Sequence, residues 1–182
     1  DFANIHFSGS RSATPPIALS QDIMSGSTVI PLTDASTINP GDTVGLGMVI
    51  TEDFITAHEM DGLWTFSGGQ RKTLFQRTVL AVDATSSPAT VTIDVPTRYP
   101  LLIRDSADIQ VEHGTLQECG IADLSVSTAV GWEAAWSFDR SHAIEFDAVE
   151  DCWMQRVHSW PGPAGDGIHH LQSGGVIVSD SR

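Results

Sequence analysis

The chain has 182 residues and a formal net charge of −14, which comes from 23 acidic and 9 basic side chains. So few Lys and Arg side chains argue against a nucleic-acid partner and against anionic membrane surfaces, because both are bound through positive charge. No stretch approaches the run of about 18 apolar residues that crosses a membrane, and the length predicts one domain, alone or with an embellishment.

The N-terminal region predicts short strands separated by turns. Apolar and polar residues alternate over residues 3–8, and Pro15-Pro16 then breaks regular structure. A second short strand is expected within residues 16–24. We interpret residues 1–27 as the first coil or coils of a β-solenoid.

Residues 28–99 predict a small antiparallel β-unit inserted between solenoid coils. Its strands are expected over residues 28–32, 43–50, 72–82 and 90–95, and the last two form a hairpin. Gly45 and Gly47 interrupt the second of these strands. The segment 51–60 is the one expected helix, with the Thr51 hydroxyl as its N-cap.

Residues 100–182 predict a parallel β-helix. Segments that begin at Cys119, Cys152 and Val176 can be laid over one another, with apolar residues in their first and third columns and a second offset shorter than the first. Approximate repetition of this kind is typical of a solenoid, and the alternation has the period of a strand. Parallel crossovers prefer a right-handed path. The predicted fold class is therefore all-β, a partial right-handed parallel β-helix with an inserted antiparallel β-unit.

The same alignment produces two side-chain columns. Asp123, Arg156 and Asp180 alternate in charge, which favours a structural ladder of ion pairs across neighbouring strands. Cys119 and Cys152 also share a column, at a strand spacing within reach of a disulfide. Parallel side chains suit a bridge poorly, so that buried free thiols and a disulfide are both open.

The candidate site lies where loops 130–142 and 160–167 leave the same edge of the stacked coils. Exposed Trp rings can stack on sugar rings, and His, Arg and carboxylates can supply acid–base chemistry. The candidate catalytic residues are His142, Arg140, Arg156, His158 and Asp166, and the candidate substrate-binding residues are Trp132, Trp136 and Trp160. The alternative is that Trp132, Trp136 and Trp153 are packing residues at coil corners.

No metal site is predicted with a defined ligand set. His169 and His170 are adjacent, so a strand directs them to opposite faces. The acidic residues around the expected helix, from Glu52 and Asp53 to Glu59 and Asp61, favour a solvated face, with a loose Ca²⁺ site as the alternative.

Residues 119–126 and 142–153, together with a Pro40-Gly41-Asp42 turn, resemble the pectate-lyase-like (pectin-lyase fold) superfamily. The resemblance is to its large exported bacterial members and covers roughly residues 28–182. It implies a parallel β-helix and a polysaccharide context. The polygalacturonase catalytic signatures are absent, and the Ca²⁺-binding Asp cluster and paired Arg of pectate lyases cannot be assigned, so that function needs the site itself.

These observations predict a secreted, extracellular or cell-surface protein that acts on or binds polysaccharide, as a lyase or glycosidase or a fragment of one. The alternative is a non-catalytic structural, matrix or surface-fibre module. A phage-type trimeric spike is a third interpretation, although obvious trimer-core signals are missing. Because solenoid ends need caps, further coils or a neighbouring subunit are expected at the C-terminal end.

Overall fold

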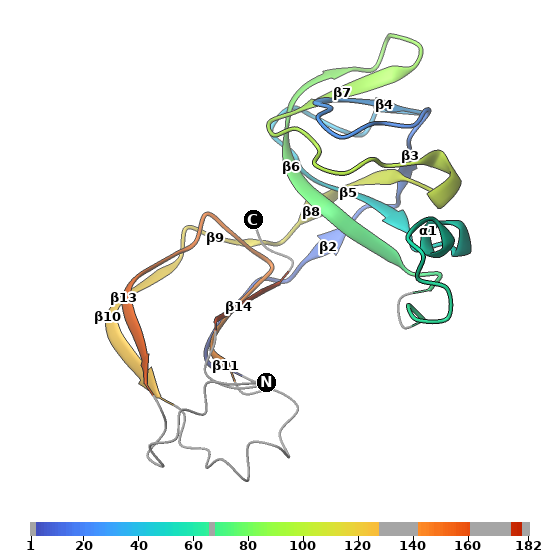
Figure 1. The fold of residues 1–182 in the computed structure, drawn as a ribbon. Coiled ribbons are helices and arrows are strands. Elements are labelled where there is room, and N and C mark those ends of the chain that lie inside the picture. Colours follow the sequence, from blue (N-terminus) through green and yellow to red (C-terminus); the bar gives the residue numbers. More distant parts are fainter. Residues whose placement is uncertain (1–2, 66–67, 128–141, 161–175, 180–182) are drawn as a thin grey trace. The chain divides into compact units, whose positions relative to one another are not determined.

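The computed structural model describes residues 3–65, 68–127, 142–160 and 176–179 (Figure 1). The chain divides into two compact units, one formed by residues 1–11 and 114–182 and the other by Ser12–His113. We call them the β-helical unit and the inserted unit. No helix among the described residues is long and apolar enough to cross a membrane.

The inserted unit is an antiparallel sheet. Its strands are β2 (Ser12–Ala13), β3 (Ile17–Ala18), β4 (Val29–Leu32), β5 (Thr43–Val49), β6 (Arg71–Asp83), β7 (Ala89–Ile93) and β8 (Asp108–His113). They follow the order β2-β8-β5-β6-β7-β4, and β3 also pairs with β8. The long strand β6 pairs with β5 through its first half and with β7 through its second, with an irregularity between Val79 and Ala81. The predicted hairpin of β6 and β7 is therefore confirmed.

Alternating apolar residues of these strands build one core. Leu46 and Ile109 of the paired strands β5 and β8 are fully buried, as are Ile30 and Val91 of the paired strands β4 and β7. Burial of such side chains contributes about 1.5–3 kcal/mol each to folding. This core gives the inserted unit a hydrophobic interior of its own.

The two glycines of β5 let polar side chains cross that strand. A Cβ at Gly47 would lie 2.8 Å from Cζ of Arg71, whose Nε donates to both carboxylate oxygens of Asp108 at 2.8 and 2.9 Å. At Gly45 a Cβ would meet the carboxylate of Glu112, which accepts a hydrogen bond from Gln76 Nε2 at 2.8 Å. Side chains of β6 and β8 thus bond to one another across β5, which lies between them in the sheet.

The helix α1 (Glu52–Ala57) is shorter than the predicted segment 51–60. Its predicted N-cap is confirmed, because the Thr51 hydroxyl accepts a hydrogen bond from the Phe54 amide at 3.0 Å. The same hydroxyl donates to the buried carboxylate of Asp105 in the 3₁₀ helix η1 (Ile103–Asp105). The helix is therefore fixed to the unit at its first turn.

The β-helical unit consists of parallel ladders. Its strands are β1 (Ala3–Ser8), β9 (Leu116–Gln117), β10 (Gly120–Ser127), β11 (His142–Asp147), β12 (Val149–Glu150), β13 (Trp153–Trp160) and β14 (Val176–Ser179). They form the parallel ladders β1-β11-β14, β9-β12 and β10-β13, and Figure 1 shows β10 beside β13. Successive strands along the chain belong to different ladders, and each ladder pairs a strand with its equivalent one coil on. The predicted parallel β-helix is confirmed.

Two of the ladders repeat at the same sequence spacing, and the pairing of β11 with β14 is one residue shorter. Leu116 pairs with Val149 and Gly120 with Trp153, so that β9 and β10 pair with β12 and β13 at one and the same sequence spacing. Left-handed backbone recurs at this spacing, at Glu118 (φ 53°) and Asp151 (φ 53°) and again at Asp123 (φ 57°) and Arg156 (φ 50°). The repeat therefore specifies turns as well as strands.

Apolar residues from several coils form the interior of this unit. Ile144 and Phe146 of β11 are buried together with Val126 and Val149. The ring of Phe7 on β1 stacks on that of Phe146, with centroids 4.8 Å apart. The N-terminal strand is thus part of the β-helical core, as predicted.

The third predicted rung has a different place. Val176 pairs with Ile144 of β11 and does not share a ladder with Cys119 and Cys152. The alignment of Val176 with Cys152, and the shorter second offset that it required, were therefore wrong. A short Val-Ile-Val run fits the inward pattern of any rung, so alternation alone does not select its ladder.

The inserted unit is also wider than the predicted segment 28–99. Ser12 pairs with His113 and Ile17 with Ile109, so β2, β3 and β8 belong to the antiparallel sheet. Only residues 1–11 of the predicted coil 1–27 belong to the β-helical unit. Pairing partners separated by almost the whole insert leave no local signal in the sequence.

The insertion occurs at a coil corner. In one coil, the single residue Ala148 joins β11 to β12. At the equivalent corner between β1 and β9, the chain leaves after residue 11 and returns at Gly114, whose carbonyl accepts a hydrogen bond from the Ser10 amide at 2.8 Å.

Candidate functional site

The exposed side of the β10–β13 ladder brings several polar and aromatic side chains into one row. Trp153, Gln155, Arg156 and His158 of β13 are exposed, beside Asp123 and Ser125 of β10. The ladder pairs Ser125 with His158 and Gly120 with Trp153. We call this set of residues the outer wall. It spans at most about 17 Å from Trp153 to His158 at the rise of a β-strand.

The indole of Trp153 lies over the backbone of β10. A Cβ at Gly120 would lie 2.2 Å from Cδ2 and Cε2 of Trp153. Only glycine leaves room for the ring at this position. Trp153 nevertheless has 50% of its surface exposed. One side of the ring is therefore held against the strand while a large part of it faces solvent.

An ion pair joins the same two strands three residues further along the ladder. Arg156 donates from Nε and Nη2 to the two carboxylate oxygens of Asp123, the second bond measuring 2.6 Å. These bonds lower the pKa of the Asp123 carboxyl below its ordinary value of 3.8 and raise the pKa of the Arg156 guanidinium. The predicted Asp123–Arg156 rung of a charge ladder is confirmed, whereas Asp180 lies outside the described residues.

The structure describes only part of the predicted site. Arg156 and His158 lie in the outer wall. His142 begins β11 and Trp160 ends β13, so their backbones lie in two different ladders. The remaining predicted residues lie outside the described part of the chain: Arg140, Asp166, Trp132 and Trp136.

Trp153 is the residue that the sequence interpretation missed. It was expected to be a packing residue at a coil corner, but half of it is exposed. The available signal was Gly120, which occupies the paired position of the preceding coil. A glycine opposite a tryptophan is the pattern of a ring laid across a strand.

Neither cysteine is bridged. Cys119 and Cys152 are free, and each Sγ donates to the backbone carbonyl of a residue just before it, Gln117 at 3.3 Å and Glu150 at 3.5 Å. Of the two alternatives that the sequence left open, the structure has free thiols, although both are half-buried and not buried as expected. The same bond thus recurs at equivalent positions of two successive coils.

Within the described ranges, no group of three or more His, Cys, Asp or Glu side chains is placed to hold a metal ion. The acidic residues for which a loose Ca²⁺ site was the alternative to a solvated face lie on and after α1. Glu52 and Asp53 are exposed in its first turn, and Asp61 accepts a hydrogen bond from the Thr56 hydroxyl at 2.7 Å.

No protein-family model matches the chain, and no curated protein matches it. Three similar solved structures are phage tailspikes. The tailspike gp49 of Pseudomonas phage LKA1 has 13% identity and a TM-score of 0.49, over 100% of this chain and 35% of that chain. The tailspike gp61 of Pseudomonas phage phi297 has 12% identity and a TM-score of 0.47, over 93% and 34%.

The third is the Gp54 tailspike of Acinetobacter baumannii bacteriophage AP22, in complex with A. baumannii capsular saccharide. It has 16% identity and a TM-score of 0.47, over 85% of this chain and 22% of that chain. The chain therefore spans about a fifth to a third of the length of these structures.

Proposed function

We propose that the protein binds a neutral polysaccharide along the outer wall of its β-helical unit. The observation that carries the proposal is the indole of Trp153, which is half exposed and rests on Gly120. A sugar ring presents an apolar face of C–H groups that packs on such a flat aromatic surface. Because the ring is already fixed, binding orders little additional side chain.

The neighbouring groups support a neutral polymer. Asp123 and Arg156 balance each other's charge, while Gln155 and Ser125 offer uncharged hydrogen-bonding groups. The net charge of −14 would repel a polyanion over the whole surface. A long polymer can contact several residues of the outer wall at once. The proposal also implies an extracellular setting, in which such polymers occur.

Cleavage of the polysaccharide is the second candidate. His158 is exposed on the same wall, and His142, Arg140 and Asp166 remain predicted catalytic residues. A glycosidase normally uses a pair of carboxylates. Asp123 is the carboxylate that the outer wall contains, and it is already bonded to Arg156. Release of oligosaccharides from neutral and uronic-acid polymers, with and without Ca²⁺, would separate a lyase or glycosidase from a binding protein.

The binding proposal is tested with matched variants of neighbouring residues. We expect Trp153→Ala to weaken binding of neutral oligosaccharides by about tenfold in calorimetry. Gly120→Ala keeps the indole but displaces it, because the new Cβ occupies its place. It should also weaken binding. Met154→Ala is the control, since Met154 is the next residue and is 44% exposed. Equal affinities of wild type and Trp153→Ala would overturn the proposal.

A further inference from the structure

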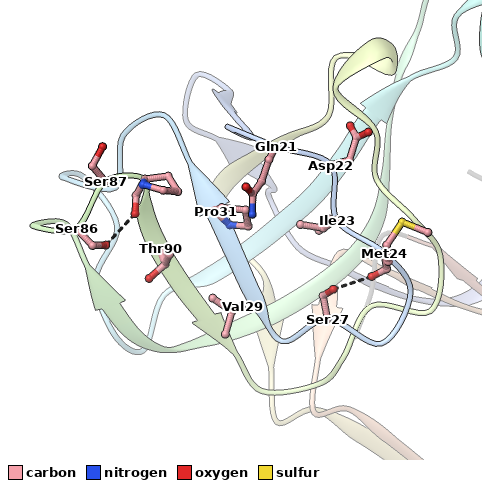
Figure 2. Close-up of a pocket in the computed structure, with 11 residues that line it drawn as sticks. Gln21, Asp22, Ile23, Met24, Ser27, Val29, Pro31, Ser86, Ser87 and Thr90 are labelled. Carbon is pink, nitrogen blue, oxygen red and sulfur yellow. Dashed lines mark hydrogen bonds between the residues drawn. The ribbon is translucent and has the colours of Figure 1, made fainter.

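The inserted unit contains a pocket that the outer wall does not involve. It lies over β4, between the segments 21–27 and 86–90, with a volume of about 550 Å³ (Figure 2). Pockets that bind small molecules commonly measure about 300–1,000 Å³. The described residues that line it all belong to the inserted unit.

The pocket has an apolar floor that is open to solvent. Val29 of β4 is 50% exposed, and Met24 at one wall is 64% exposed. Pro31 lies in the same strand, opposite Thr90 of β7, and is itself buried. An exposed apolar surface inside a concavity is typical of a site that a ligand covers.

The polar groups of the lining are uncharged, with one exception. Gln21, Ser87 and Thr90 offer a carboxamide and two hydroxyls, and Figure 2 shows the Gln21 side chain extending toward Pro31. Asp22 is the one ionisable residue of the lining, and its Oδ1 accepts a hydrogen bond from the Ile103 amide at 2.7 Å. That bond directs the carboxylate to the neighbouring backbone.

Hydrogen bonds fix both walls in place. The Met24 carbonyl accepts from the Ser27 hydroxyl at 2.8 Å and from the Thr97 hydroxyl at 3.0 Å. On the other side, the Ser86 hydroxyl donates to the Pro88 carbonyl at 2.8 Å. Figure 2 shows the Ser27 and Ser86 bonds at opposite ends of the pocket. A concavity with such braced walls is preorganised, so a ligand does not have to order them.

We infer that this pocket binds a neutral sugar unit, as a second saccharide site separate from the outer wall. A pyranose has one apolar face, which suits the exposed side chains of Val29 and Met24, and hydroxyls that suit Gln21 and Thr90. No cationic side chain lines the pocket, and Asp22 adds negative charge. An anionic sugar therefore lacks a counter-charge there.

The test uses the full chain and defined probes: glucose, galactose and N-acetylglucosamine, with glucuronate as the anionic counterpart. We expect the neutral sugars to shift the backbone amide resonances of residues 21–27 and 86–90. Glucuronate should need at least a tenfold higher concentration to produce the same shifts. No shift in these segments, or equal shifts with glucuronate, would overturn the inference.

Variants separate this site from the outer wall. Val29→Glu places a charge on the floor and should weaken neutral-sugar binding by about tenfold. Leu80→Glu is the matched control, since Leu80 is a 58% exposed residue of β6 outside the lining. Gln21→Ala, in an exposed segment, provides a second variant that leaves the strand unchanged.

Trp153→Ala distinguishes the two proposals. If it weakens polymer binding by about tenfold but leaves the shifts in segments 21–27 and 86–90, both sites are supported. Pocket binding without any effect of Trp153→Ala on the polymer would support the pocket and contradict the outer wall. If Val29→Glu and Gln21→Ala both bind sugar like the wild type, the pocket inference is wrong whatever Trp153 does.

Discussion

Each unit contains an Arg–Asp ion pair that links two of its own strands, and the two pairs differ in how far they are buried. In the inserted unit, the side chains of Arg71 and Asp108 are 22% and 9% exposed. In the β-helical unit, those of Arg156 and Asp123 are 58% and 62% exposed. In each case the guanidinium donates from Nε and Nη2 to one carboxylate.

The glycines of the two units show the same contrast. Gly47 lies under the guanidinium of Arg71 inside the sheet, and Gly120 lies under the exposed indole of Trp153. In the first case the absent Cβ makes room for a buried polar network, in which Arg71 also donates to the Thr73 hydroxyl and the Gly45 carbonyl. In the second it leaves room for an indole that stays half exposed to solvent. The same local feature therefore accommodates a largely buried side chain in one unit and an exposed one in the other.

Removing the cation that pairs with the buried Asp108 should have the largest effect on stability. We expect Arg71→Met to lower the free energy of unfolding of the inserted unit by about 3–5 kcal/mol, because Asp108 is left buried without its partner. Chemical denaturation measures the loss. Arg71→Met with Asp108→Leu should recover part of it, since the uncompensated charge is then gone. An Arg71→Met protein as stable as the wild type would contradict a structural role of this pair.

Filling the glycine under the buried pair should have an intermediate effect. A Cβ at Gly47 would lie 2.6 Å from the Lys72 carbonyl oxygen, which is fixed in β6. Gly47→Ala should therefore cost about 1–3 kcal/mol of stability. Gly120→Ala is the comparison, because there the obstacle is a side chain that can move outward. If thermal unfolding showed the same loss of stability for Gly47→Ala and Gly120→Ala, the distinction between the two glycines would be wrong.

Breaking the exposed pair should have the smallest effect. At neutral pH, Arg156→Gln should leave the midpoint of unfolding unchanged within error, since exposed ion pairs contribute little. The pair lowers the pKa of Asp123, so its contribution is present above the ordinary value of 3.8 and is lost as the pH falls through the lowered pKa. Arg156→Gln should raise the pKa of Asp123 toward 3.8, which NMR titration of its carboxyl carbon measures. An unchanged pKa would show that the bond does not form in solution.

The local repeat made the β10–β13 ladder predictable from sequence. Residues 119–124 and 152–157 align with one spacing, and the opposite charges of Asp123 and Arg156 mark a contact between adjacent coils. The position of β14 was not predictable, because its short apolar run fits more than one ladder.

The limits of the inserted unit and the role of Trp153 depend on long-range structure. Ser12 and His113 pair from the two ends of the insert, and no local pattern indicates such a pairing. The exposure of Trp153 follows from its contact with Gly120 in the preceding coil. From the sequence alone, a tryptophan is equally consistent with a buried packing residue, because tryptophan is highly buried on average.

The corner at which the chain leaves the β-helical unit has a consequence for how this protein can diversify. One coil turns there with Ala148 alone, while the coil before it accommodates Ser12–His113 between Ser10 and Gly114, which are bonded to each other. Because exit and re-entry coincide, a foreign domain with close termini could be transplanted into this junction without altering the rungs on either side. The β-helical unit would then serve as a scaffold that keeps its ladders while the domain inserted at this corner is exchanged.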